Sequence, residues 1–332
     1  MEKTKIIMDV DTGTDDACAL ALAMLDPHFD LLGITTVNGN LEVRLTTDNT
    51  LRVVECCGKA GQVKVYRGAD LPMVCTLDPN SLQSLEPIPH REGMKIKGAI
   101  HSDHLPLPAP AIHEERQRAV PWLIDTLLAA GDHEITIVAV GPLTNIGLAL
   151  RSDERIIAKI KEVVIMGGGD RITNASPAAE FNIFGDPEAL EILLQSGIKT
   201  TIVPLDATHQ ALINEAQAAD LLAIGTAPAK LFHDTIMERI AAYGRRDSDM
   251  GALKATPLHD PLALCYVIHP EVLPEVVPAN CHVVLQGHAT GRTVVDWRER
   301  YEKPPVNCYW ACKADRKFFL GWITDVLTAA KG

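Results

Sequence analysis

The chain has 332 residues, of which 47% are hydrophobic and 22% charged, and these proportions exclude wholesale disorder. The length suffices for one large α/β domain or two small ones, with a substantial core. A formal net charge of −12 argues against nucleic acid or a membrane surface as partner, because an acidic surface repels phosphate groups. We therefore expect a small neutral substrate, or one held through a cation.

The first residues indicate a folded strand instead of a targeting segment. Residues 1–9 contain two acidic side chains and no long apolar run, so we expect neither a signal peptide nor a membrane span. The eight cysteines form no Cys-x-x-Cys pair, and Cys308 and Cys312 lack a histidine at zinc-finger spacing. We therefore predict reduced, buried thiols in a cytoplasmic protein.

Short apolar segments alternate along the chain with longer helix-like segments. The predicted strands are residues 5–10, 31–37, 63–66, 134–140, 162–166 and 200–204. The predicted helices are residues 15–25, 45–57, 121–130, 143–150 and 187–195, with a closing amphipathic helix over 315–330. This pattern is typical of the α/β class: a mostly parallel central sheet with helices on both faces, a Rossmann-like open sheet. Because such sheets bind ligands beyond the carboxyl ends of their strands, the residues after each strand are the candidates for a site.

Two regions interrupt the alternation. Residues 70–113 hold seven prolines and four histidines without clear periodicity, which is typical of a lid or binding loop. Residues 227–257 look helical around 231–243 and then polar and flexible over 244–251, so we predict a second mobile segment there. Without a repeat or a linker in the sequence, we expect a single domain over residues 1–332.

Four carboxylates fall within eight residues where the first strand ends and the first helix begins. Asp15 and Asp16 suit the first turn of a helix capped by Thr14, where the helix dipole favours anions. Capping does not explain Asp9 and Asp11, and like charges this close raise one another's pKa unless a cation neutralises them. Carboxylate oxygens select Ca²⁺ or Mg²⁺ over zinc. The cluster therefore predicts a metal site.

One alternative follows from the Asp-x-Asp half of this cluster. Phosphatases of the haloacid dehalogenase type place a nucleophilic aspartate after their first strand and use Mg²⁺. They usually continue with Thr or Val at the fifth place, where this chain has Gly13, and no later acidic motif of that family is evident. A Mg²⁺-dependent phosphatase stays the alternative interpretation.

Read as a unit, DVDTGTDDA at residues 9–17 resembles the N-terminal signature of the inosine-uridine nucleoside hydrolase family. Further motifs similar to that family follow in order across nearly the whole chain. They are TVNGN at 36–40, GPLTN at 141–145, VIMGGG at 164–169, Asn174, AEFN at 179–182, DPEA at 186–189, LDATHQ at 205–210 and LHDP at 258–261. So many ordered motifs are more specific than any one of them. The resemblance implies the nucleoside hydrolase fold and hydrolysis of the N-glycosidic bond of ribonucleosides, to free base and ribose.

The resemblance also implies a calcium centre. Ca²⁺ is expected on the carboxylates of Asp11, Asp16 and Asp260 and on the main-chain carbonyl of Val140, with the ribose hydroxyls and one water completing the coordination. Asp11 would act as the general base that takes a proton from this water. A cation that also holds the sugar diol would orient the sugar against its nucleophile.

The family places further residues around the sugar and the base. Cleavage builds positive charge on the ribose, which Glu180 and Asp15 would offset. Asn40, Asn174 and Asn182 would bind sugar hydroxyls, with Met166 near the 5′ end of the ribose. His259 would protonate the departing base.

Local patterns leave simpler interpretations open for several of these residues. The Asn38-Gly39-Asn40 segment is also good turn chemistry, and Met166 would ordinarily be a core residue. Glu180 and Asn182 alternate with Phe181, so an extended stretch would point both side chains the same way. Asp260-Pro261 reads as the N-cap and first residue of a helix that His259 merely precedes.

The chain departs from the family in its lid. Family members often have His-Gly-x-x-Gly there, whereas this chain has His101-Ser102-Asp103-His104, and no aromatic residue lies between Tyr66 and Trp122. The absence of a lid aromatic argues against purine stacking and favours a pyrimidine-preferring or broad enzyme. Tyr243 either contacts the base or packs its helix.

Two further expectations follow from the family. Its members are commonly dimers or tetramers, so a homo-oligomer is expected. A non-catalytic nucleoside or ribose binding protein is a third interpretation, which the presence of Asp11, Asp16 and Asp260 together disfavours.

Overall fold

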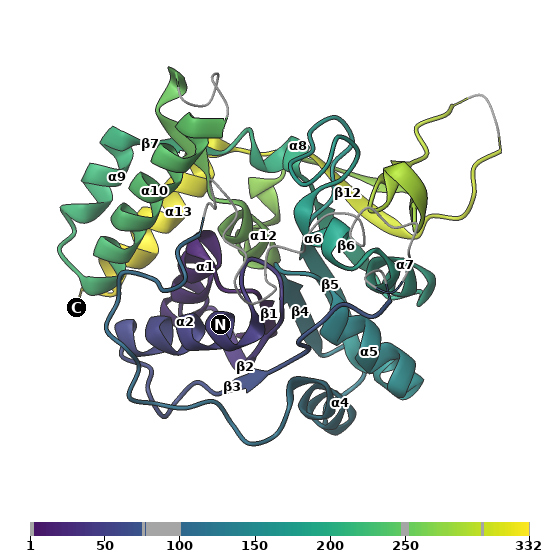
Figure 1. Cartoon of the computed structure of the whole chain (residues 1–332), viewed down its shortest axis with the longest axis horizontal. Helices are drawn as coiled ribbons and strands as arrows, with labels where there is room; N and C mark the ends of the chain where they lie inside the picture. Colours follow the sequence, from purple (N-terminus) through teal and green to yellow (C-terminus); the bar gives the residue numbers. More distant parts are fainter. Residues whose placement is uncertain (1–2, 75–76, 78–100, 247–251, 300–301, 332) are drawn as a thin grey trace.

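Strands and helices alternate along the chain in a computed structural model that describes residues 3–74, 77, 101–246, 252–299 and 302–331 (Figure 1). Among these residues the central sheet has eight strands, in the order β3-β2-β1-β4-β5-β6-β12-β9. All its neighbouring pairs are parallel except β12 and β9. The prediction of a mostly parallel central sheet is therefore confirmed. The strands are β1 Thr4–Val10, β2 Phe29–Thr36, β3 Val65–Arg67, β4 Ile135–Ala139, β5 Ile160–Met166, β6 Thr200–Val203, β9 Glu275–Ala279 and β12 Cys308–Lys313.

Alternate residues of the central strands pack into two separate cores, one on each face of the sheet. In β1, Ile6 and Met8 belong to the first core and Ile7 to the second. In β5, Val164 belongs to the first core and Val163 to the second. Successive side chains of a strand point to opposite faces, so a continuous apolar run fills both cores at once.

Helices cover both faces, as the sequence predicts. Figure 1 shows α9, α10 and α13 grouped on one side of the molecule and α4, α5 and α7 on the other. The first core is closed by α1 Thr14–Leu25, α2 Val43–Cys56, α9 Glu215–Leu222, α10 Ala227–Arg246, α12 His259–Ile268 and α13 Arg316–Ala329. The second core is closed by α4 Ala119–Ala129, α5 Thr144–Ser152 and α7 Pro187–Gln195.

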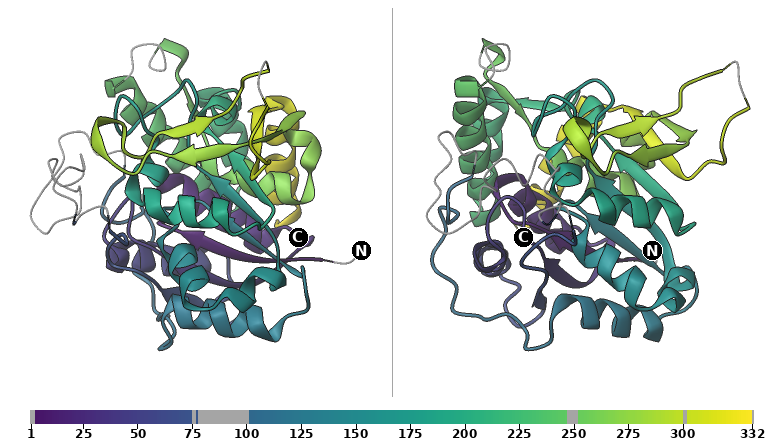
Figure 2. Two further views of the ribbon diagram at one scale, coloured as in Figure 1. Left: turned by 90° about the vertical axis from the view of Figure 1, so that its right-hand side faces the viewer. Right: turned by 45° about the vertical axis from the view of Figure 1, so that its right-hand side comes forward.

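The remaining elements are short and lie around the sheet. Two antiparallel pairs, β7 with β8 and β10 with β11, lie outside the central sheet. The right-hand view of Figure 2 shows residues 296–299 and 302–307, between β11 and β12, extending away from the central sheet. None of the described helices combines the length and the apolarity that crossing a membrane requires. The short elements are α6 Phe181–Gly185, α8 Leu205–Thr208, β7 Leu212–Asn214, β8 Ala255–Pro257, β10 Cys281–Val283, β11 Thr293–Val295 and 3-10 helices at Glu154–Lys159, Pro270–Val272 and Gly287–Ala289.

Three predicted local details are wrong. Helix α1 begins at Thr14 with Gly13 at its N-cap, so Thr14 is not the cap. Helix α12 begins at His259, two residues earlier than the Asp-Pro pattern predicts, and Asp260 lies in its first turn. Glu180 is the N-cap of α6, so the stretch after it is helical instead of extended.

Both segments predicted to be mobile lie partly outside the described residues, which omit 75–76, 78–100 and 247–251. Residues 101–113 form neither helix nor strand, which agrees with a loop. Helix α10 continues through Arg246, beyond the predicted helical stretch 231–243, so residues 244–246 are helical instead of a flexible segment.

Candidate active site

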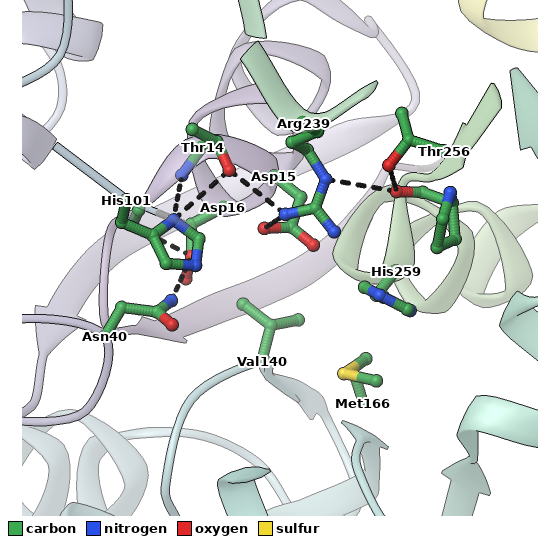
Figure 3. A network of polar contacts seen from close by, with 12 residues as sticks. Thr14, Asp15, Asp16, Asn40, His101, Val140, Met166, Arg239, Thr256 and His259 are labelled. Carbon is green, nitrogen blue, oxygen red and sulfur yellow. Dashed lines mark hydrogen bonds and ion pairs between the residues drawn. The ribbon is translucent and has the colours of Figure 1, made fainter. Parts of the chain in front are cut away.

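The candidate site lies at the carboxyl edge of the sheet, where the parallel strands β1, β2, β4 and β5 end (Figure 3). Each strand delivers one or two functional groups to this edge within a few residues of its end. Helices α10 and α12 supply the groups that face them. The residues that meet here are Asp11, Asp15, Asp16, Asn40, Val140, Met166, Arg239, His259 and Asp260.

The Asp16 carboxylate organises the turn between β1 and α1. It accepts hydrogen bonds from the backbone N–H groups of Gly13 at 3.0 Å and Asp11 at 3.1 Å, and from the Asn40 amide at 3.1 Å. An acid in the first turn of a helix is favoured by the dipole, and here it also fixes the preceding loop. Burial and the charge of Asp15 raise the pKa of Asp16 to about 7.

Asp11 is fully buried beside Asp16. One of its oxygens, Oδ2, accepts from the Asn40 backbone N–H at 2.6 Å, whereas Oδ1 is buried and has no hydrogen-bond partner among the described residues. Burial and the charge of Asp16 raise the pKa of Asp11 well above its usual value. A Cβ at Gly39 would overlap Oδ2 of Asp11, so the turn must have glycine there. The prediction of a turn at this point is compatible with a role for Asn40 in the site.

The donor set fits a divalent cation. Asp15, Asp16 and Asp260 are buried, and each offers a carboxylate oxygen within 4.8 Å of the others. Burial, followed by the charges of Asp15 and Asp16, raises the pKa of Asp260 well above its usual value. Buried carboxylates at this separation need a cation to stay ionised, and the unpartnered Oδ1 of Asp11 is a further acceptor for it. A set made only of oxygens suits Ca²⁺ or Mg²⁺.

Arg239, which the sequence analysis missed, contributes a buried cation to this cluster. Its Nη1 lies 2.6 Å from Oδ1 of Asp15 and 3.0 Å from the Thr14 hydroxyl, and its Nε donates to the Pro257 carbonyl at 3.2 Å. A signal for it exists in α10, where Arg239 follows buried Phe232 and Ile236 at helical spacing. A charged residue on the apolar stripe of a helix is the pattern to look for.

His259 is buried and has a hydrogen-bond partner at each ring nitrogen. Its Nδ1 lies 2.7 Å from the Thr208 hydroxyl, and its Nε2 lies 3.0 Å from the Tyr243 hydroxyl. Burial and the nearby positive charge of Arg239 lower the pKa of His259 well below its usual value, so the imidazole is neutral at pH 7. Tyr243 therefore does more than pack its helix, and Thr208 is a second partner that the sequence analysis missed.

Glu180 and Asn182 belong to the turn that opens α6. The Glu180 carboxylate accepts from three backbone N–H groups, those of Gly168 at 2.9 Å, Asn182 at 3.0 Å and Ile183 at 3.2 Å. Burial raises the pKa of Glu180 to about 7. The Asn182 amide donates to the carbonyls of Val140 at 2.7 Å and Met166 at 3.0 Å, which ties α6 to the ends of β4 and β5.

Two predicted residues are placed differently from the rest. Asn174 is exposed, and its amide oxygen accepts from the Phe181 N–H at 2.9 Å, so its described contact is with the start of α6. Asp9 is buried below the site, where it accepts from the Thr35 hydroxyl at 2.5 Å and the Asn145 amide at 2.8 Å. These partners hold Asp9 within the sheet, and Asp9 is not one of the metal ligands predicted here.

His101 brings the loop that follows the undescribed part of the lid to the start of α1. Its Nδ1 accepts from the Thr14 N–H at 3.0 Å and lies 3.2 Å from the Thr14 hydroxyl (Figure 3). A Cβ at Gly13 would overlap this ring. His101 therefore lies at the site, although the lid motif that it opens lacks the two glycines found in the family.

Comparisons with known proteins show which sequences and structures this chain is similar to. A family model described as inosine-uridine preferring nucleoside hydrolase matches residues 6–321. The chain is 37% identical to the inosine-uridine preferring nucleoside hydrolase of Leishmania major, over 97% of each chain. It is 35% identical to the pyrimidine-specific ribonucleoside hydrolase RihB of Escherichia coli, over 98% of this chain and 97% of that protein. Among solved structures, the purine-preferring ribonucleoside hydrolase from Gardnerella vaginalis superposes with a TM-score of 0.84 at 28% identity, over 99% of both chains.

Proposed function

Because the chain belongs to the inosine-uridine preferring nucleoside hydrolase family, and so is an N-glycosidase that hydrolyses ribonucleosides, we propose that it works through a calcium ion. The carboxylates of Asp11, Asp16 and Asp260 and the carbonyl of Val140 would hold this ion. The observation that carries this proposal is the buried Oδ1 of Asp11, which has no described partner beside two other buried carboxylates. The family model and these relatives favour a nucleoside hydrolase over the alternative Mg²⁺-dependent phosphatase.

Asp11 is the general base in this proposal. A calcium ion bound at the cluster supplies positive charge that favours the deprotonated form of a nearby water. The Asn40 N–H holds the Asp11 carboxylate in place, and this carboxylate takes the proton from the water that attacks the sugar. Burial excludes bulk water from this carboxylate, so its orientation is fixed before the substrate binds.

Acidic and amide side chains around the cluster bind the sugar. Glycosidic cleavage builds positive charge on the ribose, and the buried carboxylates of Glu180 and Asp15 offset it. Both amide hydrogens of Asn182 are used by main-chain carbonyls, so its amide oxygen accepts from a sugar hydroxyl. Asn40 and Asn174 bind the other hydroxyls, and Met166 packs near the 5′ end of the ribose.

His259 protonates the departing base. The Thr208 hydroxyl has one hydrogen and two acceptors near it, His259 Nδ1 at 2.7 Å and the Leu205 carbonyl at 3.3 Å. The shorter contact favours donation to Nδ1, which leaves the proton of a neutral imidazole on Nε2. The Tyr243 hydroxyl accepts from that nitrogen in the free protein, and the departing base takes its place during the reaction. For this step the ring must first gain a proton from solvent at Nδ1, with the Thr208 hydroxyl turning to accept it, because an imidazole that gave up its only proton would become an imidazolate.

We propose that the enzyme accepts pyrimidine ribonucleosides, as a pyrimidine-preferring or broad hydrolase. The lid segment has no aromatic residue between Tyr66 and Trp122 on which a purine would stack. The relatives include pyrimidine-specific and purine-preferring enzymes by name, so the substrate panel must contain both classes.

The test is release of free ribose from uridine, cytidine, inosine and adenosine by calcium-loaded protein, with metal content measured on the same sample. Ribose release together with stoichiometric calcium supports the proposal, and loss of both on chelation supports it further. Asp11→Asn keeps the shape of the side chain and removes the base, so it should abolish turnover while the protein stays folded. Normal turnover in this variant contradicts the mechanism.

We also propose a domain organisation, an oligomeric state and a location in the cell for this chain. A single domain over residues 1–332 with a lid at 70–113 and a second mobile segment at 227–257, whose helix α10 would move as a unit, should give one cooperative unfolding transition. Protease cleavage should be confined to the non-helical parts of those two segments. A homo-oligomer, dimer or tetramer, should appear in light scattering. Fractionation of the cells that make the protein should place it in the cytoplasm.

A further inference from the structure

Arg239 reaches into the acidic cluster from helix α10. Figure 3 shows its guanidinium between Asp15 and His259. The ion pair with Asp15 spans 224 positions of the sequence, and only 2% of the Arg239 side chain is exposed. Bonds to the Thr14 hydroxyl and the Pro257 carbonyl fix the guanidinium from two other directions. A guanidinium held by three partners has a defined position and cannot swing into solvent without losing all of them.

The site contains more negative charge than Arg239 can balance. Asp11, Asp15, Asp16 and Asp260 are all buried there, and among the described residues Arg239 is the basic side chain that forms an ion pair with them. A buried charge is costly unless it is paired, so Arg239 stabilises one of the four carboxylates and leaves three. A divalent cation is the group that those three require.

Distance alone would favour Asp15 as one of the three carboxylates that hold that ion. Oxygens of Asp15, Asp16 and Asp260 lie within 4.8 Å of one another, so a trio that includes Asp15 is geometrically available. Asp15 is also the carboxylate whose Oδ1 already receives the short bond from Arg239. Arginine keeps its proton under all conditions in a protein, so this bond cannot be converted into a metal contact by deprotonation.

We propose that Arg239 is an internal cation that selects the metal ligands: it keeps Asp15 outside the coordination sphere and weakens cation binding by repulsion. This inference rests on the proposed function, because it takes the ion to be held by Asp11, Asp16 and Asp260. Asp15 thereby stays available to the substrate. The guanidinium of Arg239 orients the Asp15 carboxylate, which then faces the positive charge that develops on the ribose. Arg239 is a positioning residue in this account, since it acts on the substrate through Asp15.

The test is a calorimetric titration of calcium into metal-stripped protein. Arg239→Gln removes the charge but can still hydrogen-bond Asp15, and it should bind calcium roughly tenfold more tightly than the wild type, because a repelling charge near the ion is lost. Arg239→Lys keeps the charge and should stay near the wild-type affinity. Lys230→Met is the matched control, because Lys230 lies on the same helix and pairs with Asp234 at the surface. It removes the same charge, and screening by water should keep its affinity within about twofold of the wild type.

The Asp15→Asn substitution distinguishes two effects of Arg239: exclusion of Asp15 from the metal ligands, and repulsion between the guanidinium and the ion. When Arg239 is lost, Asp15 becomes available to the ion, so the gain in affinity should shrink when Asp15→Asn is combined with Arg239→Gln. If Arg239→Gln raises the calcium affinity equally with and without Asp15→Asn, Asp15 is not the carboxylate that Arg239 keeps away from the ion. Calcium binding by Arg239→Gln that equals or falls below that of the wild type overturns the whole inference. A purely structural role for Arg239 predicts that second result.

Two further comparisons distinguish failure of this inference from misfolding of Arg239→Gln and from failure of the proposed function. If Arg239→Gln does not fold without metal, the double variant with Asp15→Asn removes both members of the buried ion pair, so Asp15 is not left as a charge without its partner. The calcium affinity of this double variant is compared with that of Asp15→Asn alone and should still be higher. Failure of the proposed function would be visible separately, since the wild type would then bind no calcium. Failure of this inference alone leaves wild-type binding intact and removes the gain in the variants.

Discussion

Thr208→Val should slow hydrolysis of nucleosides by weakening protonation of the departing base. Thr208 is fully buried and His259 is only 6% exposed, so water cannot replace the hydroxyl that bonds Nδ1. Valine has a similar shape and leaves Nδ1 without a partner. An unpartnered buried nitrogen costs about 1–3 kcal/mol, which corresponds to a loss of roughly 5- to 150-fold in rate if the cost falls on the transition state.

The assay compares two kinds of substrate. Uridine and inosine need a proton on the departing base, whereas p-nitrophenyl β-D-ribofuranoside releases a stable anion and does not. The kcat/KM of Thr208→Val should therefore fall for the nucleosides and stay near the wild-type value for the nitrophenyl riboside. Thr208→Ser keeps the hydroxyl and should restore most of the activity on nucleosides. An equal fall on both kinds of substrate would refute the reasoning, because it would place the effect on sugar binding or folding.

The remaining predictions concern a glycine and a buried acid. Gly39→Ala should displace Asp11, since a Cβ there would overlap Oδ2, and both calcium affinity and ribose release should fall at least about tenfold. Gly321→Ala is its control, because a Cβ at Gly321 meets nothing within 4 Å; similar losses in both variants would contradict the explanation. Burial raises the pKa of Glu180 to about 7, so its carboxyl binds more protons in the folded than in the unfolded chain and contributes stability at low pH that is lost as pH rises. Relative to Glu180→Gln, the wild type should therefore lose on the order of 2–3 kcal/mol of unfolding free energy between pH 5 and 8, measured by urea denaturation with calcium present. Parallel pH profiles for the two proteins would show that Glu180 titrates normally.

Local sequence patterns determined most of the fold. Ile6, Ile7 and Met8 form a continuous apolar run, and such runs between helices indicate a buried parallel strand whatever the rest of the chain does. The acids after β1 predict a metal site, because capping explains only two of them. The reaction is implied by the resemblance of the ordered motifs to a known family. In the structure these motifs follow strands or open helices near the same edge of the sheet.

Local patterns failed where a backbone group from elsewhere sets the conformation. Glutamate is not a preferred N-cap, so alternation with Phe181 suggested an extended stretch around Glu180. The Gly168 N–H, which lies twelve positions earlier, holds the carboxylate in place while it caps α6. Helix α12 also begins before Asp260, although Asp-Pro usually marks a helix start at the aspartate; no contact among the described residues explains this earlier start.

The polar pairs that complete the site were decided by the tertiary structure alone. Thr208 and His259 are 51 positions apart, and Asp15 and Arg239 are 224 apart. Periodicity shows that one face of α10 is apolar, and it can flag Arg239 as unusual on that face, but it cannot say which acid the guanidinium meets. That partner depends on how α10 packs against the start of α1, which is set by the summed packing of many apolar side chains across the first core. A single sequence records those side chains without recording which of them touch.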